Sequence, residues 1–134
     1  MAAGVRTIID RFLGGDEEAA FYDLIELPGD LLTDLIEEFQ ATADSEVRAL
    51  LVKAAWERKE QGVIPFLRDA LTVPDELVWQ QALDGLVAHA SDETHEILLT
   101  ARAQHFADET LTQRFRLWLG EAILQVESEL RVKT

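Results

Sequence analysis

Apolar residues recur at spacings of three and four residues along almost the entire chain. No segment of useful length alternates apolar and polar residues, so the pattern favours helices over strands throughout. It predicts helices at residues 3–13, 16–27, 30–41, 45–60, 63–72, 75–90, 92–104 and 107–131. Because the connections between them are short, we expect consecutive helices to pack antiparallel to each other.

Hydrogen-bonding side chains stand at several of the predicted helix starts. Asp16, Asp44 and Ser91 each lie where a helical run begins. Their side-chain oxygens can accept a hydrogen bond from the free backbone N–H groups of a first helical turn. These residues therefore support the predicted boundaries.

Two predicted helices indicate how the apolar side chains are buried. The helix at 107–131 carries one apolar stripe, which includes Phe115, Trp118 and Leu119, and we expect Trp118 to lie in the core. The helix at 75–90 carries two adjacent apolar stripes, so its buried arc should be unusually wide. A wide arc is typical of a helix that contacts neighbours on two sides, in the middle of a stack.

A weak internal repeat relates two parts of the chain at an offset of 31 residues. Eight apolar or small residues between 47 and 70 fall on apolar or small residues between 78 and 101. Ala54 falls on Gly85, and small residues let two paired helices approach closely. One interpretation is a solenoid of helix–turn–helix units. The other is a chance alignment of two amphipathic helix pairs.

The same region resembles consecutive HEAT-type repeats. The resemblance covers residues 44–71 and 74–102, and it is carried by the small and leucine residues at 82–86 and by the run at 64–67. It implies an all-α fold, a short HEAT-like α-solenoid of about eight antiparallel helices in a single domain over residues 1–134. The first three helices fit no clear repeat, and the last helix is longer than a standard unit.

Acidic residues are concentrated in one part of the chain. The 134 residues include 26 acidic and 12 basic side chains, which gives a formal net charge of −14. Residues 12–47 contain 11 acids and no base, so this stretch carries −11 of that charge. One interpretation is a solvated face, neutralised in part by Arg48, Lys53 or Arg58 of later helices. The other is a docking surface for a cationic partner, because a concentrated field of one sign accelerates association.

Eight residues are candidates for contact with such a partner. The candidate electrostatic contacts are Asp23, Glu26, Asp34, Glu37 and Glu38. The candidate anchors are Trp56, Trp79 and Asp84, since tryptophan is enriched at binding hot spots. Core packing is the alternative for both tryptophans. A role in capping a loop or bridging two repeats is the alternative for Asp84.

The sequence contains little that indicates catalysis. It has no cysteine, no GxSxG or HExxH motif and no glycine-rich phosphate loop. Asp92 and His95 stand three residues apart, but a single imidazole on one helical turn does not make a metal site. We therefore expect no catalytic residue, no metal and no cofactor.

Charge and hydropathy also bear on location and partners. No apolar run is long enough to span a bilayer, and no apolar segment precedes Asp10 as a secretory signal would require. The net charge disfavours nucleic acid, because affinity for nucleic acid comes mainly from Lys and Arg on phosphates. We expect a cytoplasmic protein that contacts neither membrane nor nucleic acid. The oligomeric state stays open.

Residues 78–91 also resemble small, acidic, HEAT-like immunity proteins of bacterial polymorphic toxin systems. This resemblance implies a non-catalytic protein that neutralises a cognate toxin by direct binding, with a basic toxin domain as its partner. One alternative is a HEAT-like adaptor or scaffold with a partner that is not a toxin. Another is a small helical enzyme or lyase-like subunit.

Overall fold

Residues 2–133 are described by a computed structural model, in which they form eight α-helices and one short 3₁₀ helix and no strand. The elements are α1 (Ala2–Leu13), α2 (Glu17–Glu26), α3 (Leu32–Ala41), α4 (Ser45–Glu57), α5 (Val63–Ala70), α6 (Glu76–Ala88), α7 (Asp92–Thr100), η1 (Ala101–Ala103) and α8 (Glu109–Lys133). The all-helical class expected from the apolar pattern is confirmed for this part of the chain.

Predicted and observed helices differ mainly at their ends. The helix predicted at 45–60 ends at Glu57, because Lys59 adopts a left-handed backbone conformation with φ at 56°. The next helix begins after Gly62, which also has a positive φ, at 83°. A glycine accepts this conformation without the steric penalty that a side chain brings.

The helix caps agree in part with the sequence. The Asp44 side chain accepts the N–H of Val47, at 2.9 Å. Ser91 and Thr94 form a reciprocal capping box at the start of α7. Asp16 precedes α2 as expected, but its side chain makes no cap hydrogen bond, so that part of the prediction is wrong.

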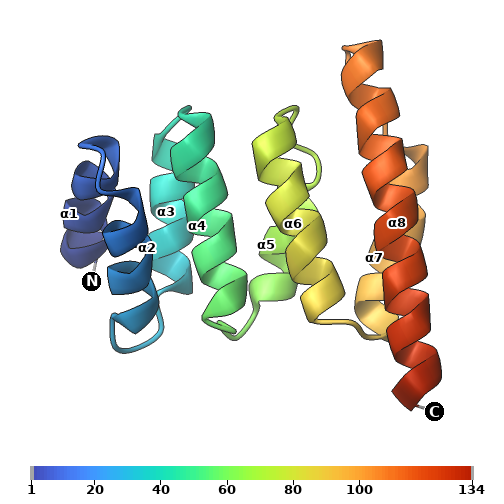
Figure 1. Cartoon of the computed structure of the whole chain (residues 1–134), viewed down its shortest axis with the longest axis horizontal. Coiled ribbons are helices and arrows are strands. Elements are labelled where there is room, and N and C mark those ends of the chain that lie inside the picture. Colours follow the sequence, from blue (N-terminus) through green and yellow to red (C-terminus); the bar gives the residue numbers. More distant parts are fainter. Residues whose placement is uncertain (1, 134) are drawn as a thin grey trace.

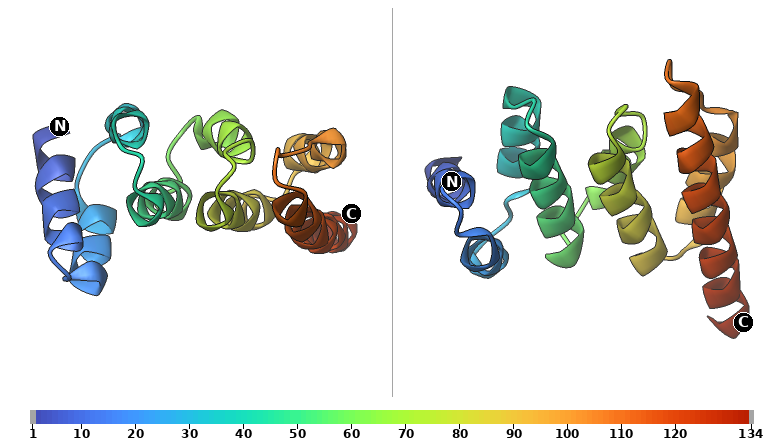
Figure 2. Two further views of the ribbon diagram at one scale, coloured as in Figure 1. Left: turned by 90° about the horizontal axis from the view of Figure 1, so that it is seen from above. Right: turned by 45° about the horizontal axis from the view of Figure 1, so that its top comes forward.

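The helices lie in two rows. Figure 1 shows α2, α4, α6 and α8 side by side in front of the odd-numbered helices. Seen from above in Figure 2, α3, α5 and α7 stand end-on behind α4, α6 and α8, whereas α1 is seen along its length at one end. We call α2, α4, α6 and α8 the even row, and the surface that it turns toward the viewer of Figure 1 the front face.

Two kinds of contact join the helices. Consecutive helices pack as the pairs α1–α2, α3–α4, α5–α6 and α7–α8. The even-numbered helices also pack directly on their neighbours in the row, and the contact between α4 and α6 is the most extensive. From α3 onward, successive helices alternate in direction, so that α4, α6 and α8 run the same way (Figure 1).

The core is deepest where α4 meets α6. On α6, both predicted stripes are buried, as Val78 and Ala82 of one stripe and Trp79 and Leu83 of the other show. The wide buried arc expected for this helix is therefore confirmed. The close approach of the two helices depends on Gly85, whose Cα lies against the indole ring of Trp56.

A buried arginine joins α4 to the end of α2. The Arg58 guanidinium donates to the backbone carbonyls of Leu24, Ile25, Leu27 and Gly29, at 2.7–2.9 Å. These carbonyls belong to the last turn of α2 and the loop that follows, where a positive charge also favours the helix dipole. Arg58 further pairs with the buried Glu60 at 2.7 Å. This contact fixes α2 against the rest of the even row.

Candidate functional site

The acidic block at residues 12–47 is partly neutralised, and the basic residues that do so come from α1. Arg11 pairs with Asp23 at 2.6 Å, and Arg6 pairs with Glu38 at 3.2 Å. Both arginines precede the block in sequence. These two ion pairs therefore come from the helix that lies across the end of the stack.

The basic residues of later helices make other contacts. The Arg48 side chain donates to the Thr42 carbonyl at 2.7 Å. Lys53 pairs with Glu57 of its own helix at 3.8 Å, and Arg58 is committed to Glu60 and to backbone carbonyls. These contacts thus join the three bases to groups other than the acidic side chains of residues 12–47, and Lys53 lines a hollow beside Glu17, Glu18 and Glu46.

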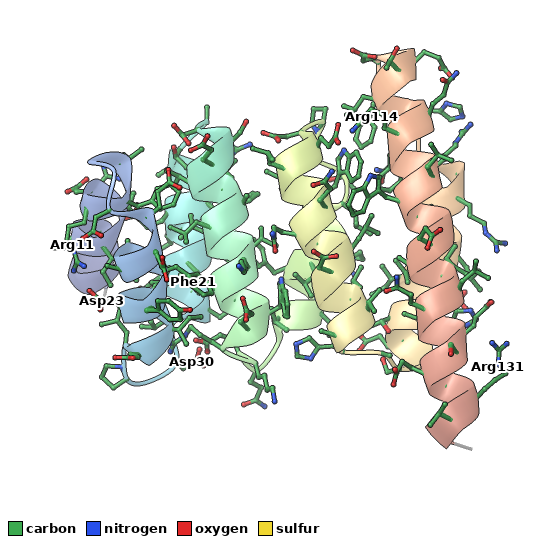
Figure 3. All side chains as sticks on the ribbon, viewed as in Figure 1. Arg11, Phe21, Asp23, Asp30, Arg114 and Arg131 are labelled. Atoms are coloured by element: carbon green, nitrogen blue, oxygen red, sulfur yellow. The ribbon has the colours of Figure 1, made fainter. Side chains whose placement is uncertain are left out.

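The five predicted electrostatic contacts belong to two helices, α2 and α3. Asp23 and Glu26 line a hollow between α1 and α2, and Figure 3 shows Asp23 pointing from α2 toward α1. Asp34, Glu37 and Glu38 belong to α3, which lies behind the even row. α3 thus stands in the row of α5 and α7, and the expectation that these residues share a docking face with the later helices stays a prediction.

The two tryptophans proposed as anchors have different surroundings. Trp79 is fully buried and packs edge-to-face on Phe115, with 5.2 Å between ring centroids. It belongs to the core and is not accessible as an anchor. Trp56 is half-buried, and its indole N–H donates to Gln81 at 3.4 Å.

Trp118 was expected in the core, but 42% of it is exposed. It lies at the edge of the α8 stripe and turns toward the space between α6 and α8, where it lines a cleft. Leu117 beside it is 73% exposed. The prediction that Trp118 lies in the core is therefore wrong. The periodicity of apolar residues locates the centre of a buried stripe better than its edge.

Two hollows lie between helices of the even row, one on each side of the closely packed α4–α6 contact, and we take both as part of the front face because their lining comes mainly from that row. The first lies between α2 and α4 and has a volume of about 460 Å³. Its aromatic residues are Phe12, Phe21 and Tyr22, and its carboxylates are Glu17, Glu18 and Glu46. Lys53 also lines it, with the ammonium group 4.5 Å from the centre of the Phe21 ring.

The second hollow, the α6–α8 cleft, has a volume of about 280 Å³. It is lined by Leu83, Asp84 and Val87 from α6 and by Leu117, Trp118, Glu121, Ala122 and Gln125 from α8. The described lining therefore combines an apolar floor with two carboxylates and includes no basic side chain. Of the eight residues predicted from sequence, Asp84 is the one in this cleft.

The environment of Asp84 is unfavourable for its charge. Desolvation raises the pKa of the Asp84 carboxyl above its usual range, and the positive charge of Lys53 opposes this shift in part. Glu76 of the same helix accepts a hydrogen bond from Arg114 of α8, and this hydrogen bond lowers the pKa of Glu76. The Arg114 Nη2 and Glu76 Oε2 atoms lie 2.5 Å apart. The two carboxyls of α6 thus shift in opposite directions.

One feature of the sequence indicates the cleft. On α8, Leu117 lies outside the apolar stripe although it is large and apolar, and it lines the cleft. Leu117 precedes Trp118 directly, so the two residues widen the apolar surface of α8 toward α6. A large apolar residue on the polar side of a helix is expected to be exposed. Such a residue therefore indicates this part of the molecule as a binding surface.

The described part of the chain offers little for metal chemistry. Within residues 2–133, no group of three or more histidine or acidic side chains is placed to hold a metal ion. His95 lies 3.0 Å from Glu127, and His89 contacts the Trp56 carbonyl at 3.1 Å, so both join neighbouring helices. None of the helices in that same part of the chain combines the length and the apolar character needed to cross a bilayer.

Comparison with family models, with curated proteins and with solved structures gave no match.

Proposed function

We propose that this protein is a non-catalytic protein-binding module whose front face binds a basic protein. One observation carries the proposal: both front-face hollows have apolar or aromatic floors with carboxylates beside them. The described residues that line them include five carboxylates and one ammonium group, that of Lys53. Apolar area supplies affinity in such an interface, and a charge excess of one sign selects partners of the opposite sign.

We also infer that the two rows of helices are a short HEAT-like α-solenoid. The inference is supported by the sequential pairing of antiparallel helices and by the even row, in which α4, α6 and α8 run in one direction. The repeat offset places Ala54 and Gly85 at equivalent positions on α4 and α6. Extended faces of stacked helices are the binding surfaces of solenoid proteins.

The most specific form of the proposal is an immunity protein that neutralises a cognate basic toxin domain. It is supported by the resemblance of residues 78–91 and by the excess of carboxylates on the front face. Carboxylates beside an apolar surface can occupy the sites at which a nucleic-acid-cleaving toxin binds the phosphates of its substrate. A toxin-domain gene next to the gene for this chain would favour this form over a general adaptor.

The experiment is affinity capture from the native host with three versions of the full chain. The first is the wild type. The front-face variant carries Glu17→Gln, Glu18→Gln, Glu46→Gln and Glu121→Gln. The odd-row control carries Glu37→Gln, Asp69→Asn, Glu93→Gln and Glu96→Gln, which change the net charge equally at exposed positions of α3, α5 and α7.

We expect one basic protein to be retained by the wild type and by the odd-row control and to be lost from the front-face variant. Equal loss from both variants would mean that total charge matters and that the front face does not. Equal retention by all three would overturn the proposal. Circular dichroism of each variant verifies that the helices remain folded.

A further inference from the structure

The α6–α8 cleft is unusual for a helix–helix contact because it exposes large apolar side chains beside carboxylates. Trp118 and Leu117 are 42% and 73% exposed, and Trp118 directly precedes the buried Leu119 of the same helix. Exposed aromatic and aliphatic groups that border a hollow are typical of a surface that a partner covers. The cleft is the part of the front face where Asp84, a sequence-predicted anchor, lies.

The charges around the cleft determine which kind of group fits. Asp84 and Glu121 line it from opposite helices, and no basic side chain is among its described lining residues. Arg114 of α8 is engaged with Glu76 through two hydrogen bonds, at 2.7 and 2.5 Å. A cationic group entering the cleft would thus meet two carboxylates with no base among the described lining residues, and Lys53 is the base whose charge also acts on Asp84.

The apolar lining of the cleft distinguishes an arginine side chain from a lysine side chain. Leu83, Val87 and Ala122 can cover the methylene stem of a long side chain. The Trp118 indole favours a planar guanidinium, which stacks on aromatic faces and is more weakly hydrated than an ammonium group. A guanidinium also has enough donors to reach two carboxylates at once.

The size of the cleft limits its occupant. Its volume of about 280 Å³ is near the lower limit of the roughly 300–1,000 Å³ of small-molecule and cofactor sites. The cleft also opens on the front face, beside the surface that the proposed partner would cover. One side chain from a bound protein fits these constraints better than a free cofactor does.

We propose that the α6–α8 cleft receives one arginine side chain of the partner, held by Trp118, Asp84 and Glu121. This inference rests on the proposed function and adds the residue type and its position. The arginine is the anchor of the interface, and the α2–α4 hollow contributes a second, wider contact area.

The test is a titration of the isotope-labelled full chain with N-acetyl-L-arginine amide, followed by ¹H–¹⁵N correlation spectra. We expect saturable shifts of the Trp118 indole N–H and of the backbone amides of residues 83–87 and 117–122. The neutral isostere N-acetyl-L-citrulline amide should bind about tenfold more weakly, because it cannot form charge-assisted hydrogen bonds. The lysine analogue should also bind more weakly than the arginine one.

Two variants complete the test. Asp84→Asn should weaken arginine binding by about tenfold, and Glu37→Gln on α3 should leave it unchanged. The spectrum of each variant shows directly whether it is folded. Equal binding of the citrulline and arginine probes, shifts confined to other helices, or an Asp84→Asn variant that binds normally would overturn the inference.

Failure here is distinguishable from failure of the proposed function. If the arginine probe does not bind but the front-face variant still loses its partner, the cleft assignment is wrong and the binding face stands. If capture is unaffected by the front-face variant, the proposed function itself is wrong.

Discussion

The indole ring of Trp56 lies so close to Gly85 that a Cβ atom added to the glycine would stand 2.8 Å from two ring atoms. It would also stand 2.9 Å from a methyl carbon of Leu67. Such a contact joins α4, α5 and α6 at the centre of the stack. The glycine is therefore required by packing, although it lies inside a helix.

Replacing this glycine should destabilise the protein even though alanine is the better helix former. We expect Gly85→Ala to lower the free energy of unfolding by about 1–2 kcal/mol, because overpacking outweighs the gain in helix propensity. Gly120→Ala is the matched control, since nothing lies within 4 Å of its added Cβ. It should raise stability by about 0.5–1 kcal/mol. Urea unfolding measures both, and equal signs would contradict the packing claim.

The buried Arg58 should be among the most sensitive positions of the fold. We expect Arg58→Ala to cost about 3–5 kcal/mol, because the Glu60 carboxylate loses its buried ion pair and four backbone carbonyls lose the Arg58 donor. Arg68→Ala removes an exposed pair with Asp69 and should change stability by less than about 0.5 kcal/mol. Similar effects of the two substitutions in urea unfolding would show that Arg58 does not fix α2.

Two tryptophans that look alike in sequence should differ in their effect on stability. Trp79→Ala empties a fully buried site and should cost about 3–5 kcal/mol. Trp118→Ala removes a side chain that is 42% exposed, and we expect a loss of no more than about 1–2 kcal/mol. Thermal unfolding of the two variants compares them directly. Equal losses would mean that Trp118 lies in the core after all.

Asp84 should destabilise the protein at neutral pH. Its pKa is raised in the folded state, so the ionised carboxylate disfavours folding. This cost is absent below the pKa of the unfolded state and sets in as the pH rises through the raised pKa. We therefore expect Asp84→Asn to be more stable than wild type at neutral pH and equally stable in acid. Urea unfolding across a pH series measures the difference.

Glu76 on the same helix should show the opposite behaviour. Because Arg114 lowers its pKa, the ionised form favours folding above the pKa of the unfolded state, and this contribution is lost as the pH falls through the lowered pKa. Glu76→Gln should therefore be less stable than wild type at neutral pH, and the difference should vanish in acid. The same sign for the Glu76 and Asp84 variants would contradict their assigned environments.

The helices could be predicted from the sequence because their signals are local. Apolar spacing and caps such as Asp44 and Ser91 act within one or two turns, so they place helices to within a few residues. The wide buried arc of α6 was also predictable, since two adjacent stripes imply neighbours on two sides.

The candidate site was harder to predict because it depends on tertiary placement. Local sequence does not reveal that Arg6 and Arg11 reach the acids of α2 and α3. Nor does it show that α3 lies in the row behind α2, which separates Glu37 from the front face. Trp118 lies at the edge of a stripe, where small differences in packing decide between burial and exposure.

The central claim, that the front face binds a basic partner, is tested most directly by association kinetics with the captured protein. The association rate constant is measured against ionic strength for the wild type, the front-face variant and the odd-row control. We expect a steep decrease with salt for the wild type and the control, and a slower, nearly salt-independent association for the front-face variant. Identical salt dependence for all three proteins would contradict the claim.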